Sequence, residues 1–112
     1  MKYKFLVSPD FERQYKRLKK KYPSLPDDLR KFQNCFDSLD YADLGKKIRK
    51  YRLSIKSKGG GKRGGARLIT FELLVQGDIS EFLLVTIYDK SEMDNVRDEY
   101  VRQVVLDFVK SH

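Results

Sequence analysis

The 112-residue sequence has a single cysteine, Cys35, and a single histidine, His112 at its end. These counts exclude an intrachain disulfide, a cysteine zinc cluster and a histidine-based site in the core. No run of about 18 uncharged apolar residues is present, which excludes a membrane-spanning helix, and the N-terminal apolar stretch is too short for a signal peptide. We therefore expect one domain, residues 1–112, in the reducing cytoplasm.

Acidic residues are missing from one long segment of the chain. Residues 45–67 contain ten Lys and Arg side chains and no Asp or Glu. The other residues hold 14 basic and 16 acidic groups, so this segment supplies more than the whole net charge of +8. A block of one sign favours a polyanion, because each phosphate that it neutralises releases condensed counterions. The sequence thus predicts a nucleic-acid partner and no membrane partner.

The spacing of apolar residues predicts the element order β-α-α-β-β-β-α. The expected strands are residues 2–7, 50–56, 68–75 and 81–88. Helical spacing follows Ser8-Pro9 until Pro23, then covers residues 26–39, and returns near Ser91. Ser91 and Asp94 resemble a capping box at the start of that last helix. Residues 40–45 are expected to form a loop.

This order predicts an α+β domain of two layers. Consecutive strands with short turns form an antiparallel meander, and the first strand completes a mainly antiparallel sheet. The N-terminal αα-hairpin and the C-terminal helix are expected to pack on this sheet and to leave its other face polar. Alternate residues of a strand share a face, which gathers Lys50, Arg52, Ser54 and Lys56 on the polar face.

The polar face and the loop that follows it are the first candidates for a site. An ordinary solvent-exposed sheet face mixes both signs, whereas three of the four side chains on this face are cationic and none is acidic, so we expect an anion to lie across it. The loop over residues 56–67 combines five glycines with five basic residues, which favours an anion clamp over a merely soluble hairpin loop. The candidate RNA-binding residues are Lys46, Lys47, Lys56, Lys58, Lys62 and Arg63.

The position of Arg67 leaves two interpretations open. Strict alternation places Arg67 on the same face as Ile69, which is the expected core side of the sheet. Either a bulge at residues 64–65 turns Arg67 to the polar face, or its side chain reaches water at the end of the sheet.

The segment after the last strand offers a further candidate group. Tyr88 is placed to donate a proton or to stack on a base, and Lys90 to complete a basic cleft. The alternative is a capped turn with a salt bridge, which we favour for Asp89 and Glu92. The acidic residues do not cluster with other ligands, so we expect no metal and no cofactor.

Three stretches together resemble the RelE/ParE superfamily, and more narrowly the RelE- and HigB-type toxins of bacterial type II toxin–antitoxin modules. They are the strand Lys50-Tyr-Arg52-Leu, the loop Ser-Lys-Gly-Gly-Gly-Lys-Arg-Gly-Gly-Ala-Arg67, and Ile-Tyr-Asp-Lys90-Ser-Glu. The resemblance extends over nearly the whole chain. It implies a RelE-like fold and a ribosome-dependent mRNA interferase, in which a ribose 2′-OH attacks the adjacent phosphate without a metal. It also implies a cognate antitoxin.

The resemblance assigns the catalytic positions one by one. Lys50 and Arg52 match the basic pair of the second strand, Arg67 matches the arginine that opens the third, and Lys90 matches the basic residue after the last strand. Cations placed where charge develops suit phosphoryl transfer, and crowding by other cations would favour a neutral Lys50 as general base.

The sequence departs from the resemblance at one position. Where several relatives place a catalytic Tyr or His it has Val96, so Tyr88 and Lys90 are the remaining candidates for the general acid. Two other functions stay open at this point. One is a ParE-like inhibitor of DNA gyrase, and the other is an RNA-binding module without catalysis.

Overall fold

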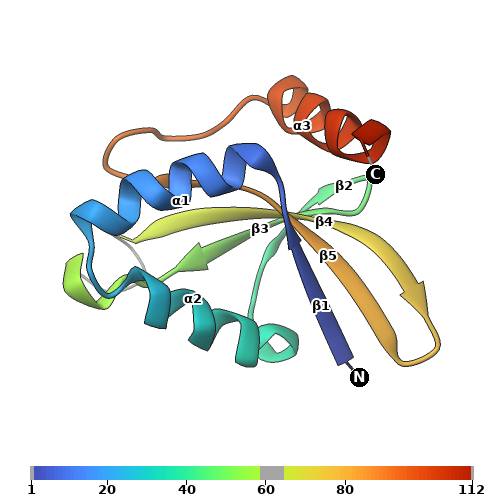
Figure 1. The fold of residues 1–112 in the computed structure, drawn as a ribbon, viewed down its shortest axis with the longest axis horizontal. Helices are drawn as coiled ribbons and strands as arrows, with labels where there is room; N and C mark the ends of the chain where they lie inside the picture. The colour runs from blue at the N-terminus through green and yellow to red at the C-terminus, as the bar shows by residue number, and fades with distance from the viewer. Residues whose placement is uncertain (1, 59–64, 112) are drawn as a thin grey trace.

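A computed structural model of the protein describes residues 2–58 and 65–111 (Figure 1). The strands are β1 (Lys2–Val7), β2 (Ala42–Gly45), β3 (Ile48–Leu53), β4 (Ala66–Gln76) and β5 (Ile79–Asp89). The helices are α1 (Pro9–Lys21), α2 (Leu25–Asn34) and α3 (Asp98–Ser111), with 3-10 turns η1 (Phe36–Ser38) and η2 (Lys56–Lys58). None of the helices in these two ranges is long and apolar enough to cross a membrane.

The five strands form one sheet in the order β1-β5-β4-β3-β2. β1 runs parallel to β5, and the other neighbouring pairs are antiparallel. The expected α+β class, the mainly antiparallel sheet and the meander of β3, β4 and β5 are thereby confirmed. The first strand enters the sheet beside the last one, so β1 and β2 are the two edge strands.

Helices α1 and α2 cover one face of the sheet. Helix α1 is capped by Ser8, whose hydroxyl oxygen accepts a hydrogen bond from the N–H of Phe11 at 2.9 Å and whose hydroxyl donates to the carbonyl of Val85 at 2.7 Å. The cap therefore ties the start of the helix to β5. The core on this side includes Phe11, Leu18, Leu25, Phe32, Tyr51, Leu68, Leu84 and Ile87.

Helix α3 packs on the opposite face, so the prediction of two layers is wrong. Its Val101, Val105 and Phe108 belong to a second core. The strand residues of that core are Ile48, Ile69, Leu83 and Val85. β4 and β5 are apolar on both faces over part of their length, which is the pattern of a strand covered on both sides. The protein thus has three layers, with the sheet in the middle.

Several boundaries differ from the predictions. Residues 42–45 form the short strand β2 in place of a loop, α2 ends at Asn34, and β3 ends at Leu53. Helix α3 begins at Asp98, well after Ser91, and the capping box is wrong. The hydroxyl and the N–H of Ser91 both donate to the Asp89 carboxylate, at 2.7 and 2.9 Å, so Ser91 closes a turn after β5.

Candidate functional site

The strand register brings cations from two strands together on the α3 side of the sheet. Arg52 pairs with Arg67, and Arg67 pairs with Tyr88, across β3, β4 and β5. Directly paired residues of neighbouring strands point to the same face. Lys50 shares this face, because it lies two residues before Arg52 and pairs with Ile69. We call Lys50, Arg52 and Arg67 the cationic row.

The register also resolves the two interpretations of Arg67. Arg67 shares its face with Ile69, as strict alternation requires, and this is the face of Lys50 and Arg52. The conflict arose from the expectation of one core face, whereas the sheet has a core on each side. No change of face is needed to bring Arg67 to the cationic row.

The three cations of the row differ in exposure. Arg52 is exposed, Lys50 is half-buried, and Arg67 is only 8% exposed. The guanidinium of Arg67 donates to the carbonyl of Ala66 at 3.2 Å and reaches that of Gly65 at 3.5 Å. A buried guanidinium is tolerated when its donors are satisfied in this way.

A close backbone approach fixes the strand that carries Arg67. A Cβ atom on Gly65 would lie 2.1 Å from the carbonyl oxygen of Leu53, so any side chain at this position would force the strands apart. Leu53 pairs with Ala66, the first residue of β4. Gly65 therefore allows β4 to start directly beside the end of β3 and sets the register of the row.

The cations of the row lack carboxylate partners at its β3 end. Within residues 2–58 and 65–111, neither Lys50 nor Arg52 forms an ion pair with an Asp or Glu side chain. Adjacent uncompensated cations repel each other, and an anion that binds across them removes this repulsion. This part of the sheet can therefore hold a phosphate.

Asp89, at the end of β5, organises the α1 side of the sheet. Its carboxylate is fully buried and accepts hydrogen bonds from the Tyr22 hydroxyl at 2.6 Å and the Lys58 ammonium at 2.5 Å, besides those from Ser91. Burial works against ionisation, but these hydrogen bonds outweigh it and hold the pKa of Asp89 well below its ordinary value. Lys21 adds a second cation at 3.6 Å.

Two predicted RNA-binding lysines contact groups on the α1 and α2 side of the sheet. Lys58 is neutralised by Asp89, and its side chain is only 15% exposed. The backbone N–H of Lys56 donates to Asp28 at 3.1 Å, and Lys56 lines a hollow beside α2 that Arg52 also lines. The structure therefore does not bring Lys56 or Lys58 together with Lys50.

Lys46 and Lys47 occupy the exposed turn between β2 and β3. Their φ angles of 52° and 68° are left-handed, which is unusual for residues with a side chain. Lys46 lines a small hollow with Asp98 and Arg102 at the start of α3, so it lies on the α3 side. The other two predicted residues, Lys62 and Arg63, lie outside the described residues.

Lys90 and Tyr88 have partners of their own. The ammonium of Lys90 donates to the backbone carbonyl of Asp94 at 2.8 Å and lies 3.8 Å from the Asp94 carboxylate. Tyr88 is 4% exposed, and its hydroxyl lies 3.5 Å from the side-chain oxygen of Asn95. Burial raises the pKa of the Tyr88 phenol, and the nearby Arg67 opposes this rise. The net shift makes Tyr88 a weaker acid than free tyrosine.

The capped turn with a salt bridge that we favoured for Asp89 and Glu92 is present, because Ser91 donates to Asp89 and Arg17 pairs with Glu92. Sequence reasoning missed the buried partners of Asp89 and the role of Arg49. Arg49 lies 4.3 Å from the ring centre of Tyr41 and 4.9 Å from that of Phe82, and it donates to the Tyr51 hydroxyl at 3.0 Å. It is therefore a packing residue of the α2 side despite its charge. Strand alternation could have indicated this, because neighbouring strand residues point to opposite faces and Arg49 therefore lies on the face opposite Lys50. No local pattern pointed to the partners of Asp89, because Tyr22 and Lys58 lie far from it in the sequence.

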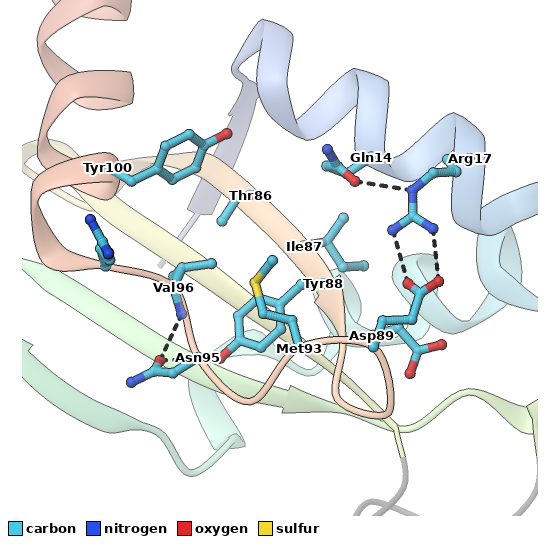
Figure 2. A pocket seen from close by; sticks show the side chains of 12 residues that line it. Gln14, Arg17, Thr86, Ile87, Tyr88, Asp89, Met93, Asn95, Val96 and Tyr100 are labelled. Atoms are coloured by element: carbon cyan, nitrogen blue, oxygen red, sulfur yellow. Dashed lines mark hydrogen bonds and ion pairs between the residues drawn. The ribbon is translucent and has the colours of Figure 1, made fainter.

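A cavity of about 430 Å³ lies beside the row (Figure 2). β1 pairs with β5 only as far as Leu84, so the last residues of β5 have no neighbour on that edge. The cavity occupies this place. It is lined by α1, by the end of β5 including Tyr88, and by the segment from Glu92 to Tyr100. Tyr88 thus belongs both to the cavity wall and to the face of the cationic row.

Within the described part of the chain, no three His, Cys, Asp or Glu side chains lie close enough together to hold a metal ion. Comparison of the sequence with models of protein families finds no match, and comparison with curated proteins finds none.

Proposed function

We propose that this protein is the toxin of a type II toxin–antitoxin module, similar to RelE and HigB, and that it cleaves mRNA on the ribosome. The observation that supports this most is the cationic row on the α3 side of the sheet. Arg67 of β4 pairs directly with Arg52 of β3, and Lys50 lies on the same face two residues before Arg52. They are three of the four positions that the resemblance in sequence singles out, the fourth being Lys90.

In the proposed reaction, the 2′-oxygen of a ribose attacks the adjacent phosphorus and gives up its proton to a base. A bond forms between phosphorus and the 2′-oxygen, and the bond to the 5′-oxygen of the next nucleotide breaks. The products are a 2′,3′-cyclic phosphate and a 5′-hydroxyl end. Negative charge gathers on the phosphate oxygens in the transition state, and preorganised cations at that point stabilise it more than water does.

The row supplies distinct parts of this reaction. Arg67 is held by backbone carbonyls and is preorganised to bind the phosphate, while Arg52 is exposed and meets the incoming RNA. The half-buried Lys50 is the proposed general base. For the leaving 5′-oxygen we propose stabilisation by the cations, with its proton taken from water, because Tyr88 is buried and Lys90 is bound to Asp94.

The same row explains why a partner would be needed in the cell. Lys50 and Arg52, which have no carboxylate partner within the described residues, favour an acidic segment of another protein, and this segment would compete with RNA for that face. We propose that the cognate antitoxin covers the row in this way.

The test is induced expression of the protein in bacteria, with mapping of mRNA 5′ ends. Wild type is expected to stop growth and to produce new ends inside translated frames. Arg67→Ala is expected to reduce cleavage about 100- to 1000-fold, because it removes one preorganised cation from the reacting phosphate. Arg30→Ala, which removes an exposed arginine of α2 paired with Asp27, is the control and should cleave like wild type.

Three results would overturn the proposal. Growth arrest with DNA damage and without mRNA cuts would indicate a gyrase inhibitor. Salt-dependent RNA binding without growth arrest would indicate a binding module. If Arg67→Ala cleaves at the wild-type rate, and circular dichroism shows that the variant is folded, the cationic row is not the active site.

A further inference from the structure

The cavity beside the cationic row has an apolar interior with an aromatic wall. Ile87 of β5 and Met93 and Val96 of the following segment line it, together with the rings of Tyr88 and Tyr100. Figure 2 shows Tyr100 and Val96 facing Gln14 and Arg17 of α1 across the cavity. An apolar slot with aromatic walls and a volume of about 430 Å³ suits a flat ring system with an attached sugar.

The ends of the cavity carry hydrogen-bond donors. The Gln14 side-chain oxygen accepts from the guanidinium of Arg17 at 3.2 Å, and the Asn95 oxygen accepts from the N–H of Val96 at 3.0 Å. These two partners are donors only, so they fix which end of each amide is the NH2 group. Neither NH2 group has an acceptor among the described residues. Both therefore remain available for carbonyl or phosphate oxygens of a ligand.

One mouth of the cavity is fixed by an ion pair between two segments. Arg17 binds both carboxylate oxygens of Glu92, at 3.1 and 3.0 Å. This two-point contact holds the segment after β5 against α1, and thereby holds the two walls apart at a set width. The cavity is thus a preformed feature of the fold.

We propose that this cavity binds one nucleobase of a single-stranded RNA whose phosphates lie on the cationic row. The inference rests on the proposed function and adds a base-binding subsite to it. Tyr88 connects the two, because it pairs across the sheet with Arg67 and also lines the cavity. A nucleotide whose phosphate contacts Arg67 would then have its base, or that of its neighbour, beside the entrance. Stacking on the Tyr100 ring would hold that base.

The experiment compares two uncleavable oligomers of equal charge, 2′-O-methyl-uridine hexanucleotide and the corresponding abasic sugar-phosphate hexamer. Their affinities are measured by fluorescence anisotropy. Wild type is expected to bind the base-bearing oligomer roughly 5- to 100-fold more tightly, since stacking of one base on an aromatic ring is worth this much. The abasic oligomer reports the phosphate contribution alone.

Three tyrosine variants assign the difference to the cavity. Tyr100→Leu should lose the preference for bases and keep its affinity for the abasic oligomer. Tyr100→Phe keeps the ring but loses the hydroxyl that donates to Asp10, and it should retain the preference. Tyr41→Leu is the matched control, because Tyr41 is similarly exposed but stacks on Arg49 on the other side of the sheet.

The outcomes separate this inference from the proposed function. Equal affinity of wild type for both oligomers, or an unchanged preference in Tyr100→Leu, overturns the base subsite. Either result is still compatible with phosphate binding by the cationic row. Absence of binding to either oligomer contradicts RNA recognition itself, and with it the proposed function.

Discussion

The two faces of the sheet use the same block of cations in opposite ways. On the α1 and α2 side, Lys58 is bound by a buried carboxylate and Arg49 is packed between aromatic rings. On the α3 side, Lys50 and Arg52 have no carboxylate partner within the described ranges. A count of charges along the chain does not separate these groups. Strand alternation and the position of the acids in space do, and they leave one face able to bind an anion.

The largest expected effect is a loss of stability on the α1 and α2 side of the sheet, where Asp89 neutralises Lys58. Asp89→Asn removes the charge that compensates Lys58, while it keeps the shape of the side chain. Removing one partner of a buried ion pair is expected to lower the free energy of unfolding by about 3–5 kcal/mol, measured by urea denaturation. Asp94→Asn changes a carboxylate that is 99% exposed and should alter stability by less than about 0.5 kcal/mol. Equal small effects of both substitutions would show that Asp89 does not hold this face together.

Acidic pH should weaken the contacts of Asp89 on the same side of the sheet. The pKa of Asp89 is lower in the folded protein than its ordinary value of 3.8, so its stabilising effect is complete above that value and is lost as the pH falls further. Thermal melting of wild type and Asp89→Asn from pH 7 to pH 2 tests this. The advantage of wild type should be constant down to about pH 4 and shrink below it. A constant advantage down to pH 2 would contradict a carboxylate held ionised by its hydrogen bonds.

Local sequence patterns predicted most of the fold and only part of the site. Alternation in residues 50–56 places Tyr51, Leu53 and Ile55 on the face opposite Lys50, and all three are buried. The side on which α3 packs could not be predicted, because the run of residues 82–85 is apolar on both faces of the strand and does not indicate which helix covers which face. For this reason the sequence predicted two layers in place of three. For the same reason Arg67 seemed to point into the only core of the protein.

For a similar reason, the structure brings some of the predicted site residues together and separates others. Lys50, Arg52 and Arg67 come together because their pairing follows from the meander, which local periodicity reveals. The ion pair between Lys58 and Asp89 joins η2 to the end of β5, 31 positions apart in the sequence, and no local pattern encodes that contact. The true start of α3 was missed because Ser91 bonds backward to Asp89, a competitor to helix capping that appears only in three dimensions.

The most direct test of the central claim is where phosphates bind. The slope of log Kd against log salt for a single-stranded RNA is measured for two variants that each lose two positive charges. Lys50→Ala/Arg52→Ala changes the cationic row, and Lys19→Ala/Lys20→Ala changes exposed lysines of α1. The account predicts that the row variant weakens binding and reduces the slope by about 1.4, which corresponds to two phosphate contacts, while the α1 variant keeps the wild-type slope. The same reduction in both variants, or a reduction in the α1 variant alone, would contradict it.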